Sequence, residues 1–160
     1  MPINSHLKVS GLAGGRISNP GEIDMLSFSW GAVSPRDAIS GQTTGKRQLR
    51  PLQITKSVDK TTVFFFQLLT TNARIDKIEL SYDKPTAGGK QEVYFSIELK
   101  NASIASQEVS QEESEITSHP AEVITFTYEE ITLTYRGEKS DGSGYLEGPV
   151  SATDRTATNK

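Results

Sequence analysis

The side chains that could carry out chemistry in this sequence begin with two histidines, His6 and His119. They lie in different segments, so the sequence contains neither an HExxH motif nor a paired-imidazole metal spacing. The chain has no cysteine, which excludes thiolate ligands and disulfides. No Gly-x-Ser-x-Gly motif marks a serine nucleophile either. We therefore expect no catalytic residue, no metal and no cofactor, and interpret both histidines as ordinary surface or loop residues.

Glutamates provide the other candidate chemistry. Glu112, Glu113 and Glu115 form an acidic cluster, and Glu129 and Glu130 form an adjacent pair. Two carboxylates catalyse glycoside hydrolysis only when they face each other across a cleft. Because neighbouring strand residues point to opposite faces, the adjacent pair would not cooperate. The simpler interpretation is a set of solvated surface charges.

The composition indicates one domain of 160 residues with a modest core, since 34% of residues are hydrophobic and 23% are charged. The formal net charge of -3 argues against nucleic acid or an anionic membrane surface as a partner. No apolar run approaches the ~20 residues that span a bilayer, so no membrane insertion is expected. The N-terminal residues lack the pattern of a standard signal peptide.

Period-two alternation dominates the chain and predicts β-strands. Large side chains alternate with small polar ones at Leu26, Phe28 and Trp30, and again in the segments 52–58, 78–82 and 93–99. The segment 124–135 alternates as well, but its phase changes across Glu129-Glu130. One extra residue there would restore a common face, so the pattern predicts a β-bulge that curves the sheet.

One helix is predicted, from Asp59 to about Thr71. Asp59 can cap the first turn, with Thr62 three residues later. Phe64 and Leu68 then fall at i, i+4 and can cover one side of a sheet, as can Phe65 with Leu69.

Two further segments differ from these elements in composition. Ser34 to Lys46 is longer than a compact connection requires, and such loops are usually functional or disordered. From Gly137 the sequence turns to Gly, Ser, Thr, Asp and Lys, which is too polar to order by itself. We expect residues 143–160 to be a flexible tail.

The outward strand positions carry mainly Ser, Thr, Gln or Tyr, while charges gather in turns and at strand ends. A monomer usually protects its edge strands with Lys or Pro. Weakly charged β faces and edges are compatible with lateral contact between subunits.

Five segments, in order, resemble the Hcp (haemolysin-coregulated protein) family of type VI secretion. They are Glu22 to Gly31, Leu52 to Thr62, Lys77 to Tyr82, Tyr94 to Ala102, and Ile124 to Tyr135 followed by Lys139 to Gly142. The resemblance covers about residues 3–142, which are taken as one Hcp-like tube domain. The sequence departs from the family at Thr70 to Ala73, where a glycine element is common, and it lacks the family's Gly-Trp ending.

The resemblance implies an all-β fold with one helix, a β-barrel-like pair of antiparallel sheets similar to a phage tail tube. It implies a homohexameric ring that stacks into a hollow tube inside a contractile sheath. Sheath contraction would expel the tube with its spike tip and effector proteins, so the protein would assemble in the cytoplasm and be secreted without a signal peptide.

Within such a ring, the β edges and the helix would meet the adjacent subunit, and the loop from Ser34 would reach the next ring. The predicted loop residues are Ser34, Pro35, Arg36, Asp37, Lys46, Arg47 and Arg50, among which Asp37, Lys46 and Arg47 are the expected polar contacts. The predicted helix residues near the subunit interface are Asp59, Phe64, Phe65 and Leu68.

Three alternatives remain open on the sequence. The chain could be a monomeric secreted β-sandwich that binds carbohydrate or peptide, or the tube protein of a related contractile injection system. It could also be a hydrolase that uses Glu129 or the cluster from Glu112 to Glu115.

Overall fold

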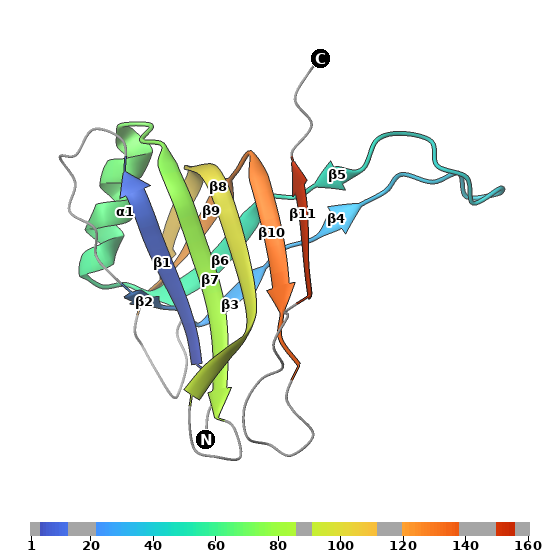
Figure 1. Ribbon diagram of the computed structural model, residues 1–160. Coiled ribbons are helices and arrows are strands. Elements are labelled where there is room, and N and C mark those ends of the chain that lie inside the picture. The colour runs from blue at the N-terminus through green and yellow to red at the C-terminus, as the bar shows by residue number, and fades with distance from the viewer. Residues whose placement is uncertain (1–3, 13–21, 86–90, 112–119, 138–149, 156–160) are drawn as a thin grey trace.

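The computed structural model describes residues 4–12, 22–85, 91–111, 120–137 and 150–155, which form eleven strands and one helix (Figure 1). The elements are β1 (Asn4–Leu12), β2 (Glu22–Asp24), β3 (Ser27–Ser29), β4 (Ala32–Val33), β5 (Gln48–Leu49), β6 (Leu52–Ser57), α1 (Lys60–Thr70), β7 (Ile75–Pro85), β8 (Gln91–Ser110), β9 (Ala121–Thr127), β10 (Glu130–Tyr135) and β11 (Val150–Arg155).

Two antiparallel sheets make the body of the molecule. The first sheet has the strand order β2-β1-β7-β8-β10-β11, and the second has the order β8-β9-β6-β3. The long strand β8 belongs to both, and β4 and β5 form a separate pair that projects from the body (Figure 1). The expected all-β architecture with a single helix is confirmed, although the sheets do not close into a barrel.

Two chain segments pass from one sheet to the other at the same place, around Asn101 and Glu129. Asn101, within β8, has a φ of 52°, a left-handed conformation that Asn tolerates better than most residues. The Glu129 N–H donates to the Lys100 carbonyl at 3.0 Å, and the Asn101 side-chain amide donates to the Glu129 carboxylate at 2.9 Å. At this point both β8 and the segment between β9 and β10 pass from one sheet to the other.

The predicted bulge at Glu129-Glu130 is therefore wrong. The segment forms two strands in different sheets, with Phe126 facing the core from the second sheet and Ile131 facing it from the first. A change of sheet reverses the phase of the inward residues just as a bulge does. The segment Glu22 to Gly31 is likewise divided between β2 and β3, and Leu26 at the division is 64% exposed.

The core lies between the two sheets and under α1. Its largest fully buried apolar side chains are Leu7, Ile23, Leu52, Ile54, Phe65, Leu68, Ile75, Ile78, Leu80, Ile97 and Phe126. The Phe65 and Phe126 rings meet edge to face with centroids 6.1 Å apart, which packs α1 against the second sheet.

The helix begins as the sequence predicts. Asp59 is the N-cap: its carboxylate accepts from the Thr61 N–H at 2.8 Å, and the Thr62 hydroxyl accepts from the Asp59 N–H at 3.0 Å. This capping box satisfies N–H groups that a helix leaves without partners. The helix ends at Thr70, close to the expected Thr71.

The C-terminal segment differs from its expected flexibility. Val150–Arg155 forms β11, which pairs with β10 in a register that sets Ala152 opposite Leu133. Backbone hydrogen bonds to an existing sheet edge can order a strand whose own apolar content is low. Residues 143–149 and 156–160 of the predicted tail lie outside the described residues.

A buried ion pair joins the second sheet to the start of α1. Lys56 on β6 and Glu122 on β9 are both 0% exposed, with Nζ 2.5 Å from Oε1. Lys56 also donates to the Asp59 carboxylate at 3.0 Å, while Glu122 accepts from the Thr62 hydroxyl at 3.0 Å and the Gln107 amide at 2.9 Å. Such a pair is tolerated in a core only with its hydrogen bonds complete.

We expect Glu122→Leu to lower the free energy of unfolding by about 3–5 kcal/mol, because Lys56 would lose its closest counter-charge inside the protein. Urea denaturation of wild type and variant measures this. Glu98→Leu, which breaks the partly exposed pair with Lys77, is the matched control and should cost at most about 1 kcal/mol. The double change Lys56→Met, Glu122→Leu should recover much of the loss, and a double variant no more stable than Glu122→Leu would contradict this account.

Candidate functional site

The adjacent glutamates are occupied in separate surface contacts. The Glu129 carboxylate accepts from Asn101, whereas the Glu130 carboxylate lies 3.7 Å from the Lys100 ammonium and 3.2 Å from the Arg155 guanidinium. They do not form a facing pair across a pocket. The cluster from Glu112 to Glu115 lies outside the described residues.

His6 lies on β1 between two carboxylates. Its Nδ1 is 3.4 Å from an Asp24 oxygen and its Nε2 is 3.4 Å from an Asp83 oxygen. In the part of the chain that the structure describes, no group of three or more potential ligands is placed to hold a metal ion. The same residues include no helix long and apolar enough to cross a membrane. His119 falls outside the described ranges.

The predicted long loop is an ordered arm. We define the arm as residues 32–49, which comprise β4, β5 and their connection, and Figure 1 shows it projecting away from the body. Arg36 and Thr43 form an isolated antiparallel bridge, and the Thr44 N–H donates to the Pro35 carbonyl at 3.0 Å. The two sides of the arm thus remain hydrogen-bonded well beyond β4 and β5.

Asp37 organises the tip of the arm. Its carboxylate accepts from the Ile39 N–H at 2.9 Å and from the Ser40 hydroxyl at 3.0 Å, and its carbonyl accepts from the Gly41 N–H at 2.9 Å. The hydrogen bond from the Ile39 N–H is the main cause that lowers the pKa of Asp37. Gly41 has a φ of 70°, which glycine adopts without strain. Asp37 therefore holds a turn, with Ile39 beside it 97% exposed.

A short hydrogen-bond chain fixes the base of the arm. The Trp30 indole N–H donates to the Tyr128 hydroxyl at 2.7 Å, and that hydroxyl donates to the Arg50 carbonyl at 2.7 Å. The Arg50 N–H in turn donates to the Gly31 carbonyl at 2.9 Å. Burial raises the pKa of the Tyr128 hydroxyl, so it stays protonated and able to donate.

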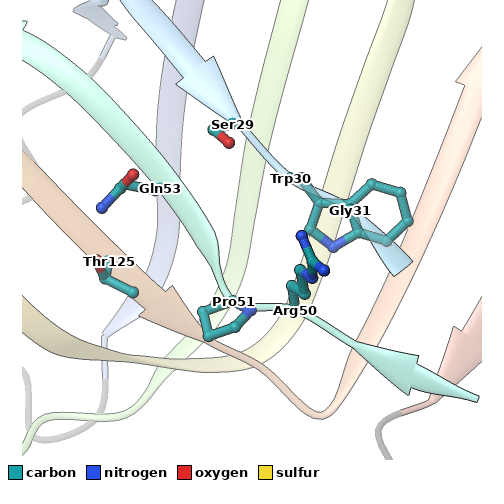
Figure 2. Close-up of a pocket in the computed structure, with 7 residues that line it drawn as sticks. All are labelled: Ser29, Trp30, Gly31, Arg50, Pro51, Gln53 and Thr125. Atoms are coloured by element: carbon teal, nitrogen blue, oxygen red, sulfur yellow. The ribbon is translucent and has the colours of Figure 1, made fainter. Parts of the chain in front are cut away.

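A pocket of about 310 Å³ opens beside the base of the arm (Figure 2). Its lining is Ser29, Trp30, Gly31, Arg50, Pro51, Gln53 and Thr125. Arg50 is its one charged side chain, and the other polar groups are hydroxyls, an amide and an indole. The lining residues include no histidine or carboxylate that could act as a general base for Ser29.

Arg47 and Asp154 join the arm to β11. The Arg47 guanidinium donates two hydrogen bonds to the Asp154 carboxylate, which lowers the pKa of Asp154 and raises that of Arg47. Beneath this pair lies a cavity of about 210 Å³ whose apolar lining includes Leu49 and Leu133. Arg47, expected to contact the next ring, is thus engaged within its own chain.

The predicted helix residues also have roles within the chain. Phe64, Phe65 and Leu68 are buried in its own core. The exposed apolar side chains of α1 are Val63 and Phe66, at 61% and 55%. Their i, i+3 spacing in the sequence already indicated a second apolar face on the helix, beside the buried one formed by Phe64, Phe65 and Leu68. That the helix lies at a subunit interface stays a prediction.

The two sheets present different outer faces. On the first sheet, Lys77 lies 3.4 Å from Glu79 and 3.5 Å from Glu98, in a mixed-charge surface. On the second sheet, the outward positions of β3, β6 and β9 carry no charge: Ser27, Ser29, Gln53, Thr55, Ser57, Ala121, Val123, Thr125 and Thr127. The uncharged β surface expected from the sequence thus covers β3, β6 and β9, whereas the β8 edge of the same face carries Glu108 opposite Val123.

Comparison with known protein families matches residues 6–135 to the family described as "Type VI secretion system effector, Hcp". The curated "Major exported protein" of Pseudomonas aeruginosa PAO1 is 35% identical over 83 residues. That match covers 52% of this chain and 48% of the relative, so it spans about half the length of each.

Solved structures with similar folds include "Crystal structure of Hcp protein", with a TM-score of 0.76 and 20% identity over 99% of this chain and 100% of that one. "Secreted protein Hcp3 from Pseudomonas aeruginosa" gives a TM-score of 0.68 with 20% identity, over 98% of this chain and 100% of the other. At these identities the likeness establishes the fold.

We expect Tyr128→Phe to lower the free energy of unfolding by about 1–3 kcal/mol, since it leaves the Trp30 N–H and the Arg50 carbonyl without their partner. Thermal unfolding followed by Trp30 fluorescence measures the change. Tyr135→Phe, at a tyrosine that is 51% exposed, is the control and should stay within about 0.5 kcal/mol. Equal effects of the two variants would refute a special role for the Tyr128 hydroxyl.

Asp154→Asn should increase amide hydrogen exchange severalfold in Val150–Arg155 at pH 7, because the arm would no longer hold β11. Exchange detected by mass spectrometry measures this, with Glu98→Gln as the control. Since the folded pKa of Asp154 is lowered, the pair stabilises above the ordinary value of 3.8 and is lost as the pH falls through the lowered value. Unchanged exchange in β11 would show that its pairing with β10 suffices.

Proposed function

Because this chain belongs to the Hcp family of type VI secretion systems, we propose that it is the structural subunit of the inner tube and not an enzyme. Six copies would form a ring, and rings would stack into a hollow tube. Contraction of the surrounding sheath would propel this tube with its spike tip and the effectors that it carries. The protein would assemble in the cytoplasm and leave the cell without a signal peptide.

The arm is the observation that supports self-assembly most directly. From Pro35 to Thr44 the connection is hydrogen-bonded within itself and projects away from the body, and its apolar tip residue, Ile39, is in solvent. None of residues 35–44 belongs to the buried core. Its order is useful if the arm contacts another copy, with Lys46 and Arg36 exposed for polar contacts.

We place the proposed ring contacts at the edges of the second sheet. One edge is β3, and the other is the part of β8 from Ser103 to Ser110, which within the described residues pairs only with β9. Contact between unlike edges of successive copies is heterologous, and it closes on itself in a ring. Closure removes the exposed edges that would otherwise promote uncontrolled pairing.

Size-exclusion chromatography with light scattering should give six times the 17.5 kDa chain mass, and electron microscopy should show rings with an open centre. Ala105→Lys, at an exposed position of the β8 edge, should reduce the particle to a folded monomer, because an edge lysine opposes strand pairing. Ala38→Lys, an equal change on the exposed arm, should leave the mass unchanged. A wild-type protein that stays monomeric at high concentration would overturn the proposed function.

A further inference from the structure

Three of the exposed apolar side chains lie in two places that are far apart, the arm tip and the outer face of α1. Ile39 at the arm tip is 97% exposed, and Val63 and Phe66 on α1 are 61% and 55% exposed. We propose that the arm tip of one copy docks, through Ile39, on the Val63–Phe66 face of α1 in a second copy. The inference rests on the proposed function and names the surface on which the arm of a stacked ring would dock.

The arm tip is organised before any contact is made. The Asp37 carboxylate bonds the Ile39 N–H and the Ser40 hydroxyl, and the Arg36 guanidinium donates to the Gly41 carbonyl at 3.4 Å. These bonds fix the backbone that presents Ile39. Docking would therefore lose little conformational entropy, which is how preorganised loops gain affinity.

The outer face of α1 is unusual for a helix that faces solvent. Val63 and Phe66 lie about one turn apart, and the exposed residues that follow are Gln67 and Thr70, both uncharged. Lys60, in the first turn, is the one charged residue of the helix. A solvated helix face normally carries charges, so this face has the character of a surface that becomes covered.

The two surfaces lie at opposite ends of the molecule. Figure 1 shows the arm extending from the end that bears β10 and β11, with α1 on the far side of the sheets. The arm tip of one chain therefore cannot contact α1 of the same chain. Contact between the tip of one copy and the helix of another is heterologous and leaves a free tip and a free helix, so it propagates along a stack.

The charge distribution of the chain also favours a second copy as the partner of the arm. The arm, residues 32–49, contains three cationic side chains and one acidic side chain, a net charge of +2. Since the whole chain carries -3, the remainder of each copy carries -5. An arm of net positive charge is attracted to the net negative body of any other copy, and this attraction raises the rate of encounter.

The size of the contact fits a stack of rings and not a pair of monomers. One isoleucine against two side chains buries far less than the ~1,000 Å² of a stable isolated interface. In a six-membered ring six such contacts form together, and each holds the next at high effective concentration. The contact is then weak between monomers and firm between rings.

The absence of cysteine in the chain allows a direct test by disulfide cross-linking. The double variant Ile39→Cys, Phe66→Cys is oxidised at high protein concentration and resolved on a non-reducing gel. Both positions are exposed, so the fold should be retained, and circular dichroism checks this. We expect a ladder that extends beyond dimers, because each copy would be linked through its tip to one neighbour and through its helix to another.

The matched control pairs Ile39→Cys with Val93→Cys, since Val93 is 42% exposed on the part of β8 that pairs with β7, away from both the proposed ring edges and the proposed contact. A ladder of equal extent from this control, or no ladder from the first pair while light scattering still shows six-membered particles, would overturn the inference and leave the proposed function standing. Dimers from Ile39→Cys alone in similar yield would mean that two tips meet, which also overturns it. Wild-type particles that are not six-membered would count against the proposed function itself.

Discussion

The buried pair of Lys56 and Glu122 fixes the geometry on which the rest of the structure depends. The two residues are directly opposite in the antiparallel register of β6 and β9, where the other inward pairs are Leu52 with Phe126 and Ile54 with Ile124. A slip by one residue would turn the apolar set outward and leave both charges without partners. The cost of an uncompensated buried charge therefore selects a single register.

That register determines where the arm and the helix lie. The helix cap Asp59 shares the Lys56 ammonium, so α1 starts at a fixed point beside β6. At the other end of β6, Arg50 precedes the strand, and its carbonyl receives the Tyr128 hydroxyl that also binds Trp30. The projecting arm is thus aligned by hydrogen bonds that originate in the core.

Much of the fold could be predicted because alternation and capping are local signals. The inward positions of β6 and β9 and the cap at Asp59 follow directly from residue order. The change of sheet at Glu129 could not be distinguished from a bulge, since both reverse the inward phase. The strand β11 could not be predicted either, because its order comes from the edge of β10 and not from its own composition. The burial of Lys56 could have been predicted, because this residue continues the inward phase of Leu52 and Ile54.

The sequence predicts a distinct segment from Ser34 to Lys46 but not the bonds that its charged residues make within the chain. The segment from Ser34 to Lys46 does form the projecting element, but Asp37 holds its turn and Arg47 binds Asp154 in the same chain. Sequence reasoning assigns charged residues to partners because it cannot see which charges are already paired inside the subunit. The paired charges make the arm rigid, and rigidity lets the uncharged Ile39 be presented at a defined position. Charges in this arm therefore set the geometry of a contact whose specificity would come from an apolar side chain, and no single such contact needs to be strong where six form together.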